Sequence, residues 1–406
     1  MNIEELKRYQ SEVENEIKTN ILPFWAYKTP DKENGGFYGL ILNDLTVDPS
    51  APKGSVLCSR ILWTFARSYT AFGDNLYLDR ASLAYKYLTD YFIDDRFGGV
   101  YWKTDHKGKP IETKKHIYAQ AFAVYALAEF YRAANSAESL RLAKDIFYKI
   151  EKFGSEKQYG GYYDAFNRDW SPAEDMRLGE GDMNAPKTMN TNLHILEAYT
   201  NLLLNWNDSD LRNSSKNLIM IIANHIIDYS SCHFKLFFKK NWEVLSDTVS
   251  YGHDIEGSWL MVEAAEILGE ESILKDIKDI SLKMADAAYK DGVAPDGGLW
   301  YEGDSKGITK FNSDWWPQAE AMVGFLNAYQ ISSREEFLQV SLNSWDFVKK
   351  YIIDKHYGEW FWSVDKDRNV NDRLEKVGIW KCPYHNARAC IEVSKRLNKI
   401  INDQNL

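Results

Sequence analysis

Two titratable side chains stand three residues apart in the segment YGHDIEGSWL, where a helix is expected to begin. This spacing places His253 and Glu256 on one helical face. His194 and Asn190, four residues apart in TMNTNLHILEAY, share a face in the same way. A lone His is most often a half-buried structural residue. The chain has only eight histidines, however, and two of them lie in similar settings.

A third His and an Arg extend this group. His385 follows a proline in WKCPYHNARAC, which suits the first turn of a helix. Arg60 heads the apolar segment CSRILWTF, where it could hold a developing negative oxygen, although a structural salt bridge is an equally common role. Three units that look successive, with His194, His253 and His385, thus each place a His at the start of a helix.

This set of side chains suits proton abstraction next to a carbonyl group. That chemistry needs a base poised near neutral pH, a second acid or base, and a cation for the enediolate oxygen. Inverting glycoside hydrolysis instead needs two carboxyl groups on opposite sides of the scissile bond, and the set is richer in His than in carboxylates. The 14 Trp, 25 Tyr and 19 Phe offer stacking faces for sugar rings. A non-catalytic sugar-binding protein would keep these aromatic residues and tolerate loss of the histidines.

The remaining histidines are expected to be structural or stay undecided. His106 lies in a turn, His225 fits an outer helix, and His356 precedes a glycine turn. For His116 and His233 the sequence favours neither a structural nor a functional role.

Double glycines followed by aromatic residues recur along the chain, in NGGFYG, FGGVYW, YGGYYD, DGGLWYE and, more weakly, YGEWFW. Successive motifs are about 60 to 68 residues apart if one unit lacks its glycines, a period typical of a repeat architecture. The segment CHFKLFF (232–238) supplies the aromatic residues of that missing element.

Apolar residues at helical spacing fill the intervals, for example in YAQAFAVYALAEFYRAA (118–134) and TNLHILEAYTNLLLNW (191–206). Each unit therefore predicts two helices and a glycine-aromatic turn or short hairpin. Helix pairs of this kind must stack on neighbours, and six can close on themselves. We expect an all-α chain with a single domain over residues 1–406, an (α/α)6 barrel. An open α-solenoid is the rival, but its repeats usually run about 33 to 47 residues.

The overall composition limits the partners. A net charge of −10 and a pI near 5.4 argue against nucleic-acid or anionic-membrane partners. No window approaches the roughly 20 apolar residues of a membrane span. The charged N-terminal segment does not resemble a secretory signal, so we expect a cytoplasmic monomer. The four cysteines form no ligand pattern and are expected to be buried free thiols.

Four segments, SRILWTF, KTMNTNLHILEAYTNL, SYGHDIEGSWL and WKCPYHNARAC, resemble in order the signatures of the cellobiose 2-epimerases of the N-acylglucosamine 2-epimerase superfamily. This resemblance implies an (α/α)6 barrel that epimerises the reducing-end glucose of β-1,4-linked disaccharides. Cellobiose would become glucosylmannose and lactose would become epilactose, with no metal, nucleotide or redox cofactor. A monosaccharide epimerase or aldose-ketose isomerase of the superfamily would share the histidines, but the Trp-rich rim favours a disaccharide.

The resemblance also implies residue roles. His253 and His385 would be the acid/base pair, Arg60 would stabilise the enediolate, and His194 would support them. The residues expected to contact the sugar are Tyr118, Asn190 and Glu256, with Trp316 and Trp380 stacking on its rings. The long loop 169–190, which contains Gly and Pro, leads into the His194 helix and is expected to cap the cavity that the inner helices of the barrel line.

Overall fold

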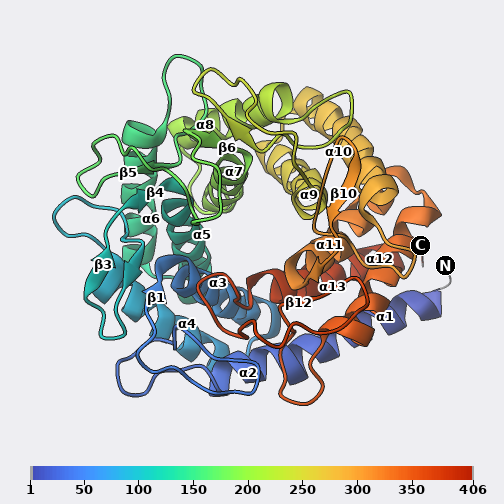
Figure 1. Ribbon diagram of the computed structural model, residues 1–406, viewed down its shortest axis with the longest axis horizontal. Coiled ribbons are helices and arrows are strands. Elements are labelled where there is room, and N and C mark those ends of the chain that lie inside the picture. Colours follow the sequence, from blue (N-terminus) through green and yellow to red (C-terminus); the bar gives the residue numbers. More distant parts are fainter. Residues whose placement is uncertain (1–2, 405–406) are drawn as a thin grey trace.

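The computed structural model describes residues 3–404 as a closed ring of paired helices (Figure 1). The inner wall consists of α3 (Ser55–Phe72), α5 (Ile117–Ala134), α7 (Met189–Leu203), α9 (Tyr251–Leu268), α11 (Trp315–Ser332) and α13 (Tyr384–Gln404). The outer wall consists of α1 (Ile3–Glu16) with α2 (Leu22–Tyr27), α4 (Asn75–Tyr87), α6 (Ala137–Lys149), α8 (Ser209–Ile221), α10 (Glu271–Gly292) and α12 (Glu335–Phe347).

The ring closes between its first and last inner helices. Each inner helix packs against the next, and α13 packs against α3. The outer helix α1 is the first described helix but packs against α13, the last, so these two helices lie side by side (Figure 1). The predicted (α/α)6 barrel is therefore confirmed, and the open solenoid is wrong.

Burial patterns explain which helices line the ring. In α5 every side chain from Ile117 to Phe130 is buried, whereas α6 buries only residues at three-and-four spacing. A helix that is apolar all round belongs between layers, and an amphipathic one belongs outside. A tight turn joins an inner helix to the outer helix that follows it. In the turn between α3 and α4 the left-handed C-cap Gly73 is followed at once by the N-cap Asp74, and between α5 and α6 the C-cap Asn135 is followed by the N-cap Ser136.

Short strands join neighbouring units at the N-terminal ends of the inner helices. A strand immediately before each inner helix except α13 pairs antiparallel with a strand from the following connection. The pairs are β1 (Lys53–Gly54) with β2 (Lys103–Thr104), β4 (Lys115–His116) with β5 (Ala165–Phe166), β6 (Lys187–Thr188) with β7 (Phe237–Phe238), β8 (Val249–Ser250) with β9 (Glu302–Asp304), and β11 (Ser313–Asp314) with β12 (Ser363–Val364). Two further strands, β3 (Pro110–Glu112) and β10 (Gly307–Lys310), extend β2 and β9.

Three of the glycine-aromatic hairpins are clasped by amide side chains of the inner helices, those of Gln120, Asn192 and Gln318. In the second unit Ile93 bridges Val100, and the Gln120 amide of α5 both accepts from the Val100 N–H (2.7 Å) and donates to its carbonyl (2.9 Å). Gly99 has φ +71°, and a Cβ there would lie 2.5 Å from Gln120 Oε1. Glycine is therefore required at this position for two reasons. It allows the positive φ, and it leaves room for the Gln120 amide.

The fourth hairpin forms without glycines. Ile227 bridges Phe234 as the corresponding residues do in other units, and Cys232 takes the left-handed conformation with φ 61°. The segment 232–238 is thus the missing repeat element. Cys232 is only half-buried, so the expectation of four buried thiols is wrong for this one and right for Cys58, Cys382 and Cys390.

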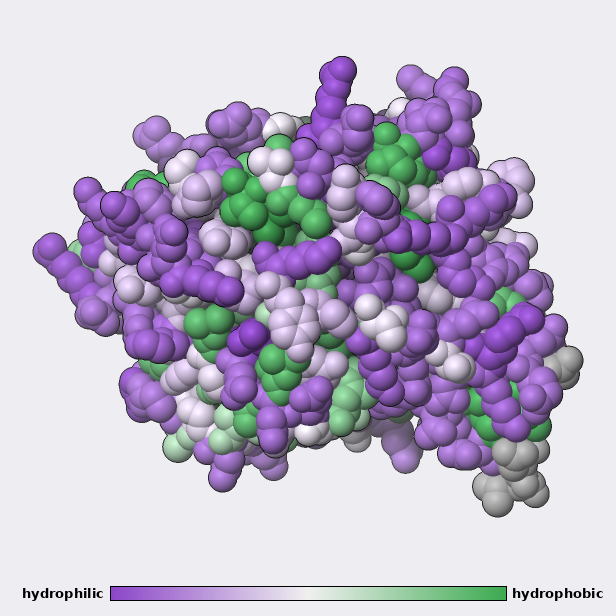
Figure 2. Space-filling model, turned by 90° about the horizontal axis from the view of Figure 1, so that it is seen from below, coloured by the Kyte–Doolittle hydropathy of each residue, from purple (hydrophilic) through white to green (hydrophobic). Residues whose placement is uncertain are grey.

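The face drawn in Figure 2 is mainly hydrophilic, and hydrophobic residues form only scattered groups on it. Within residues 3–404, none of the helices has the length and apolar character that spanning a bilayer requires.

We predict that Gly99→Ala destabilises the chain more than Gly73→Ala does. Both glycines have positive φ, but a Cβ at Gly73 meets no heavy atom of the described residues within 4 Å. Each variant should pay about 1 kcal/mol for the left-handed conformation, and Gly99→Ala should lose a further ~1–3 kcal/mol through overpacking. Urea unfolding followed by tryptophan fluorescence measures both; equal losses would contradict the amide clasp.

Candidate active site

One cavity of about 570 Å³ opens on the side of the ring that carries the short strands. We call it the pit. All of the residues predicted to act in catalysis or sugar contact line it: Arg60, Tyr118, Asn190, His194, His253, Glu256, Trp316, Trp380 and His385. The volume lies within the range of about 300–1,000 Å³ that is usual for small-molecule sites.

The inner helices deliver these side chains from their N-terminal halves. Helix α7 carries His194, α9 carries His253, and α13 carries His385. The three His-bearing units are not successive, because α11 lies between α9 and α13 and contributes Trp316. Closure of the ring brings the side chains together although they are far apart in sequence.

Arg60 is a buried cation without a carboxylate partner. Its Nη2 donates to the Tyr118 hydroxyl at 2.7 Å, and its guanidinium lies 4.3 Å from the centroid of the Phe122 ring. Within residues 3–404 it forms no ion pair, so the structural salt bridge considered above is absent there. An unneutralised guanidinium at the wall of a pit is suited to bind an oxyanion.

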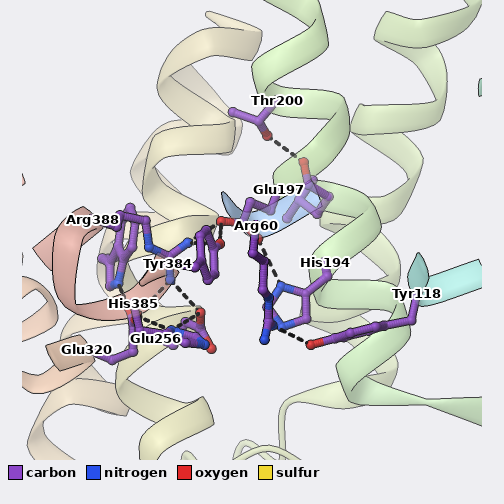
Figure 3. Close-up of polar contacts among 12 residues, drawn as sticks. Arg60, Tyr118, His194, Glu197, Thr200, Glu256, Glu320, Tyr384, His385 and Arg388 are labelled. Carbon is purple, nitrogen blue, oxygen red and sulfur yellow. Dashed lines mark hydrogen bonds and ion pairs between the residues drawn. The ribbon is translucent and has the colours of Figure 1, made fainter. Parts of the chain in front are cut away.

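Two of the three histidines hydrogen-bond buried carboxylates (Figure 3). His385 Nδ1 lies 2.7 Å from Glu320 Oε1, and His194 Nδ1 lies 2.9 Å from Glu197 Oε2. His253 Nδ1 instead lies 2.7 Å from the Ser250 hydroxyl. A partner on Nδ1 fixes the ring and leaves Nε2 as the atom that can exchange a proton with a ligand.

A single guanidinium joins the carboxylates behind the pit (Figure 3). Arg388 Nη2 donates to Glu256 Oε1 at 2.6 Å and to Glu320 Oε1 at 2.7 Å, and its Nη1 contacts Glu197 and Tyr384. All of these side chains are buried. Buried carboxylates at such close range need a cation, because desolvation would otherwise make their ionised forms very costly.

Burial sets the protonation states of the histidines. It lowers the pKa of His253 to about 3, and His194 and Arg60 add to the effect. Burial also lowers the pKa of His194, and together with the charges of Arg60 and Arg388 it lowers the pKa of His385 well below its ordinary value. The three rings are therefore neutral at pH 7, as a general base must be.

The carboxyl groups divide into ionised and protonated members. Burial opposes ionisation of Glu197, but Arg388 and His194 outweigh it and lower its pKa to about 2. Burial and then Glu320 raise the pKa of Glu256 well above its ordinary value. Burial raises the pKa of Glu320 too, but hydrogen bonds from Arg388, His385 and Trp259 engage both of its oxygens, whereas Oε2 of Glu256 has no described partner. This difference favours a proton on Glu256.

Two buried polar atoms of residues that line the pit lack a hydrogen-bond partner among the described residues. Glu256 Oε2 and Asn190 Oδ1 are buried and form no hydrogen bond with the described part of the chain. Buried polar atoms are rarely left unpaired. Polar groups of a ligand in the pit would satisfy both atoms.

Aromatic rings and a long loop shape the walls. Trp316 lies against His253 with ring centroids 4.6 Å apart, and Trp380 lies against Tyr118 with centroids 5.9 Å apart. The loop expected to cap the pit does border it through residues from Arg177 to Met183. Asp164, before the loop, accepts from the backbone N–H and hydroxyl of Thr188 at its end, which holds its two ends together.

The other histidines lie outside the pit. His225 stacks on Trp242 in an outer helical turn, and His106 and His356 lie in turns, as predicted. His116, left open by the sequence, is buried at the N-cap of α5 against Trp102. His233, also left open, bonds two aspartates outside the pit, Asp254 and Asp291.

Sequence reasoning missed the side chains behind the pit. Glu197 follows His194 by three residues, and Arg388 follows His385 by three, the same spacing that drew attention to His253 and Glu256. Glu320 follows Trp316 by four. These spacings were visible, but nothing local showed that the side chains meet across the ring.

A metal ion would fit this site poorly. Glu256, Glu320 and His385 offer ligand atoms within 4.8 Å of one another, the arrangement in residues 3–404 that most resembles a metal-binding group. Arg388 already occupies the facing oxygens of both carboxylates. A cation there would have to compete with a fixed positive charge.

The fold and the site together define a barrel enzyme with a small-molecule pit that is lined by neutral histidines. A family model for N-acylglucosamine 2-epimerase (GlcNAc 2-epimerase) matches residues 35–389. The chain is 44% identical over 388 residues to a cellobiose 2-epimerase of Bacteroides fragilis, covering 95% of this chain and 98% of that protein. The chain belongs to the N-acylglucosamine 2-epimerase family and is an enzyme of the isomerase class.

Solved structures show the same fold. The cellobiose 2-epimerase from Bacillus thermoamylovorans B4167 superposes with a TM-score of 0.92 at 42% identity, covering 96% of this chain and 100% of that chain. A D-mannose isomerase superposes with a TM-score of 0.83 at 21% identity, covering 95% and 97%, and shows the fold alone.

We predict that Arg388→Met destabilises the chain severely. The change leaves three buried carboxyl groups without their cation, and removing one partner of such a set costs about 3–5 kcal/mol. Urea unfolding measures the loss, with Arg141→Met as the control, because the ion pairs of Arg141 with Glu138 and Asp145 are exposed and should contribute little. Equal stability of the two variants would contradict the role of Arg388.

Proposed function

We propose that the chain is a cellobiose 2-epimerase, which inverts the second carbon of the reducing-end glucose in β-1,4-linked disaccharides such as cellobiose and lactose. One observation carries the proposal: His253 and His385, both neutral, share a pit with Arg60, a cation that no described carboxylate neutralises. Proton abstraction next to a carbonyl needs this combination.

The reaction begins with ring opening. A neutral His assists transfer of the anomeric proton and protonation of the ring oxygen, which forms a carbonyl at the first carbon. The protonated carboxyl group of Glu256 and the amide of Asn190, whose unpaired atoms border the pit, hold the sugar hydroxyls. His194, held by Glu197, supports the reacting end of the sugar.

Epimerisation then follows in two proton transfers. One of the two bases, His253 or His385, removes the proton from the second carbon, and Arg60 stabilises the enediolate oxygen. Rotation about the bond between the second and third carbons exposes the other face. The partner His returns a proton there, and ring closure gives the mannose configuration. Each step uses side chains of this chain alone.

The pit supports a disaccharide over a single sugar. Trp316 and Trp380 supply aromatic faces, and Tyr118 extends the wall. Loop residues from Arg177 to Met183 add to the lining of the pit. A monosaccharide would leave part of this lining without contacts.

The innermost carboxyl groups do not support inverting hydrolysis. Inverting glycosidases separate their two carboxyl groups by about 6.5–9.5 Å, with the bond between them. Glu256 and Glu320 both accept from the same Arg388 nitrogen. One carboxylate oxygen of Glu256 lies within 4.8 Å of one of Glu320. They lie on one side of the pit.

Incubation of the purified chain with cellobiose tests the proposal, with products separated by chromatography. We expect glucosylmannose at the expense of cellobiose and no free glucose. Release of glucose would instead indicate a hydrolase. Activity on free glucose or mannose with none on cellobiose would indicate a monosaccharide enzyme.

We predict that His253→Ala and His385→Ala each abolish turnover of cellobiose while the fold remains. Both side chains line a cavity, and proton transfer by a positioned group contributes roughly 100-fold to 10,000-fold to a rate. Initial rates of glucosylmannose formation and circular dichroism spectra measure the two effects. His356→Ala is the matched control, because His356 is exposed in a turn. Near-normal epimerisation in either pit variant would remove that residue from the mechanism.

A further inference from the structure

The two bases of the proposed reaction have chemically different partners on Nδ1. The partner of His385 is the carboxylate of Glu320, at 2.7 Å. The partner of His253 is the hydroxyl of Ser250, also at 2.7 Å. No hydrogen bond to the Nε2 atom of either ring comes from the described residues, so in both rings Nε2 is the atom available to a sugar.

This difference limits the neutral forms of each ring. A carboxylate only accepts hydrogen bonds, so Glu320 keeps the proton of neutral His385 on Nδ1 and leaves a lone pair on Nε2. A hydroxyl can donate or accept. Neutral His253 can therefore carry its proton on Nδ1, with Ser250 as acceptor, or on Nε2, with Ser250 as donor.

The hydroxyl of Ser250 does not cap α9, although its position before that helix would predict a cap. Ser250 immediately precedes α9, and serine there usually caps the helix by accepting a backbone N–H. Among the described residues its side chain forms no such bond. Thr188, at the same position before α7, does cap its helix by accepting from the Thr191 N–H.

Among the described residues, Ser250 is the one hydrogen-bond partner of the His253 ring. Ser250 is 3% exposed, and its backbone is fixed by pairing with Glu302 between β8 and β9. The charged or titratable groups that act on His253 are His194 from α7, Arg60 from α3 and Glu320 from α11. Trp316 packs against the ring itself. None of these groups forms a hydrogen bond to His253 in residues 3–404.

We infer that Ser250 is the positioning residue of His253, and that its hydroxyl keeps both neutral tautomers of His253 available while Glu320 locks His385 in one. His253 can then present either an N–H or a lone pair to the sugar, whereas neutral His385 presents only a lone pair. The two bases are unequal for this reason. The inference rests on the proposed function for its consequence in catalysis, but the tautomers themselves do not depend on it.

Nitrogen NMR of the protein with ¹⁵N-labelled histidine tests the tautomers without any turnover. Signals are assigned by their loss in His253→Ala and His385→Ala. At pH 7 we expect His385 to show a single form with the proton on Nδ1, and His253 to show nitrogen shifts averaged between two tautomers. A single tautomer for His253 would overturn the inference, whether or not the chain epimerises cellobiose.

Substitutions at Ser250 test the consequence for catalysis. Ser250→Ala removes the partner that orients the ring and should lower kcat for cellobiose by about 10-fold to 100-fold, the loss that follows when the partner of a metal-ligating His is removed, with little change in KM. Ser250→Thr retains a hydroxyl and should recover most of the rate. Ser258→Ala is the control: this buried serine also lies on α9, but its hydroxyl bonds the Ile255 carbonyl and should leave kcat unchanged.

Ser250→Asp separates support of the ring from freedom of the tautomer. Aspartate supports Nδ1 at least as strongly as serine but only accepts, so it should lock His253 with its proton on Nδ1 and lower kcat. Full activity of Ser250→Asp or of Ser250→Ala would overturn the inference. If the wild-type chain converts no disaccharide, the proposed function fails, and the NMR spectra still decide whether Ser250 sets the tautomers.

Discussion

The contact of one buried guanidinium with three carboxyl groups underlies the whole site. Arg388 contacts Glu197, Glu256 and Glu320 in the interior of the ring, where isolated carboxylates would be very costly to ionise. Each of these carboxyl groups has a separate task. Glu197 orients His194, Glu320 orients His385, and Glu256 turns its second oxygen to the pit. The cation thus ties together side chains from α7, α9, α11 and α13.

The position of this contact follows from the architecture. Short antiparallel strand pairs and clasped hairpins lie around one end of the ring and fix where the inner helices begin. The first two turns of those helices then point functional side chains into a common space. Arg60 completes the arrangement from α3, the helix that closes the ring against α13. An open solenoid would leave Arg60 and His385 at opposite ends of the molecule.

Much of the fold could be read from the sequence because it depends on local patterns. The period of the glycine-aromatic motifs and the apolar spacing between them suffice for six helix pairs. The fourth hairpin was obscure because Cys232 takes a left-handed conformation that glycine usually supplies, and a sequence pattern does not show φ. Nine residues that line the pit could be predicted because most are histidines, aromatic residues or an arginine in segments that resemble a known family.

The supporting residues were not found, for a physical reason. Glu197, Glu320 and Arg388 look like ordinary polar positions on apolar helices, and their meaning arises only when distant helices meet. Ser250 was hidden in another way: before a helix, a serine is expected to act as a cap. Only the geometry shows that its hydroxyl faces His253 at 2.7 Å.

The central claim is that a proton leaves the second carbon of the reducing-end sugar and another returns to the opposite face. Running the reaction on cellobiose in heavy water tests it most directly, with a companion substrate deuterated at that carbon. The account predicts deuterium at the second carbon of the epimer, earlier and more fully than in recovered cellobiose, with the non-reducing sugar unlabelled and the glycosidic bond intact. An unlabelled epimer that forms without an isotope effect, or cleavage to free glucose, would contradict the account.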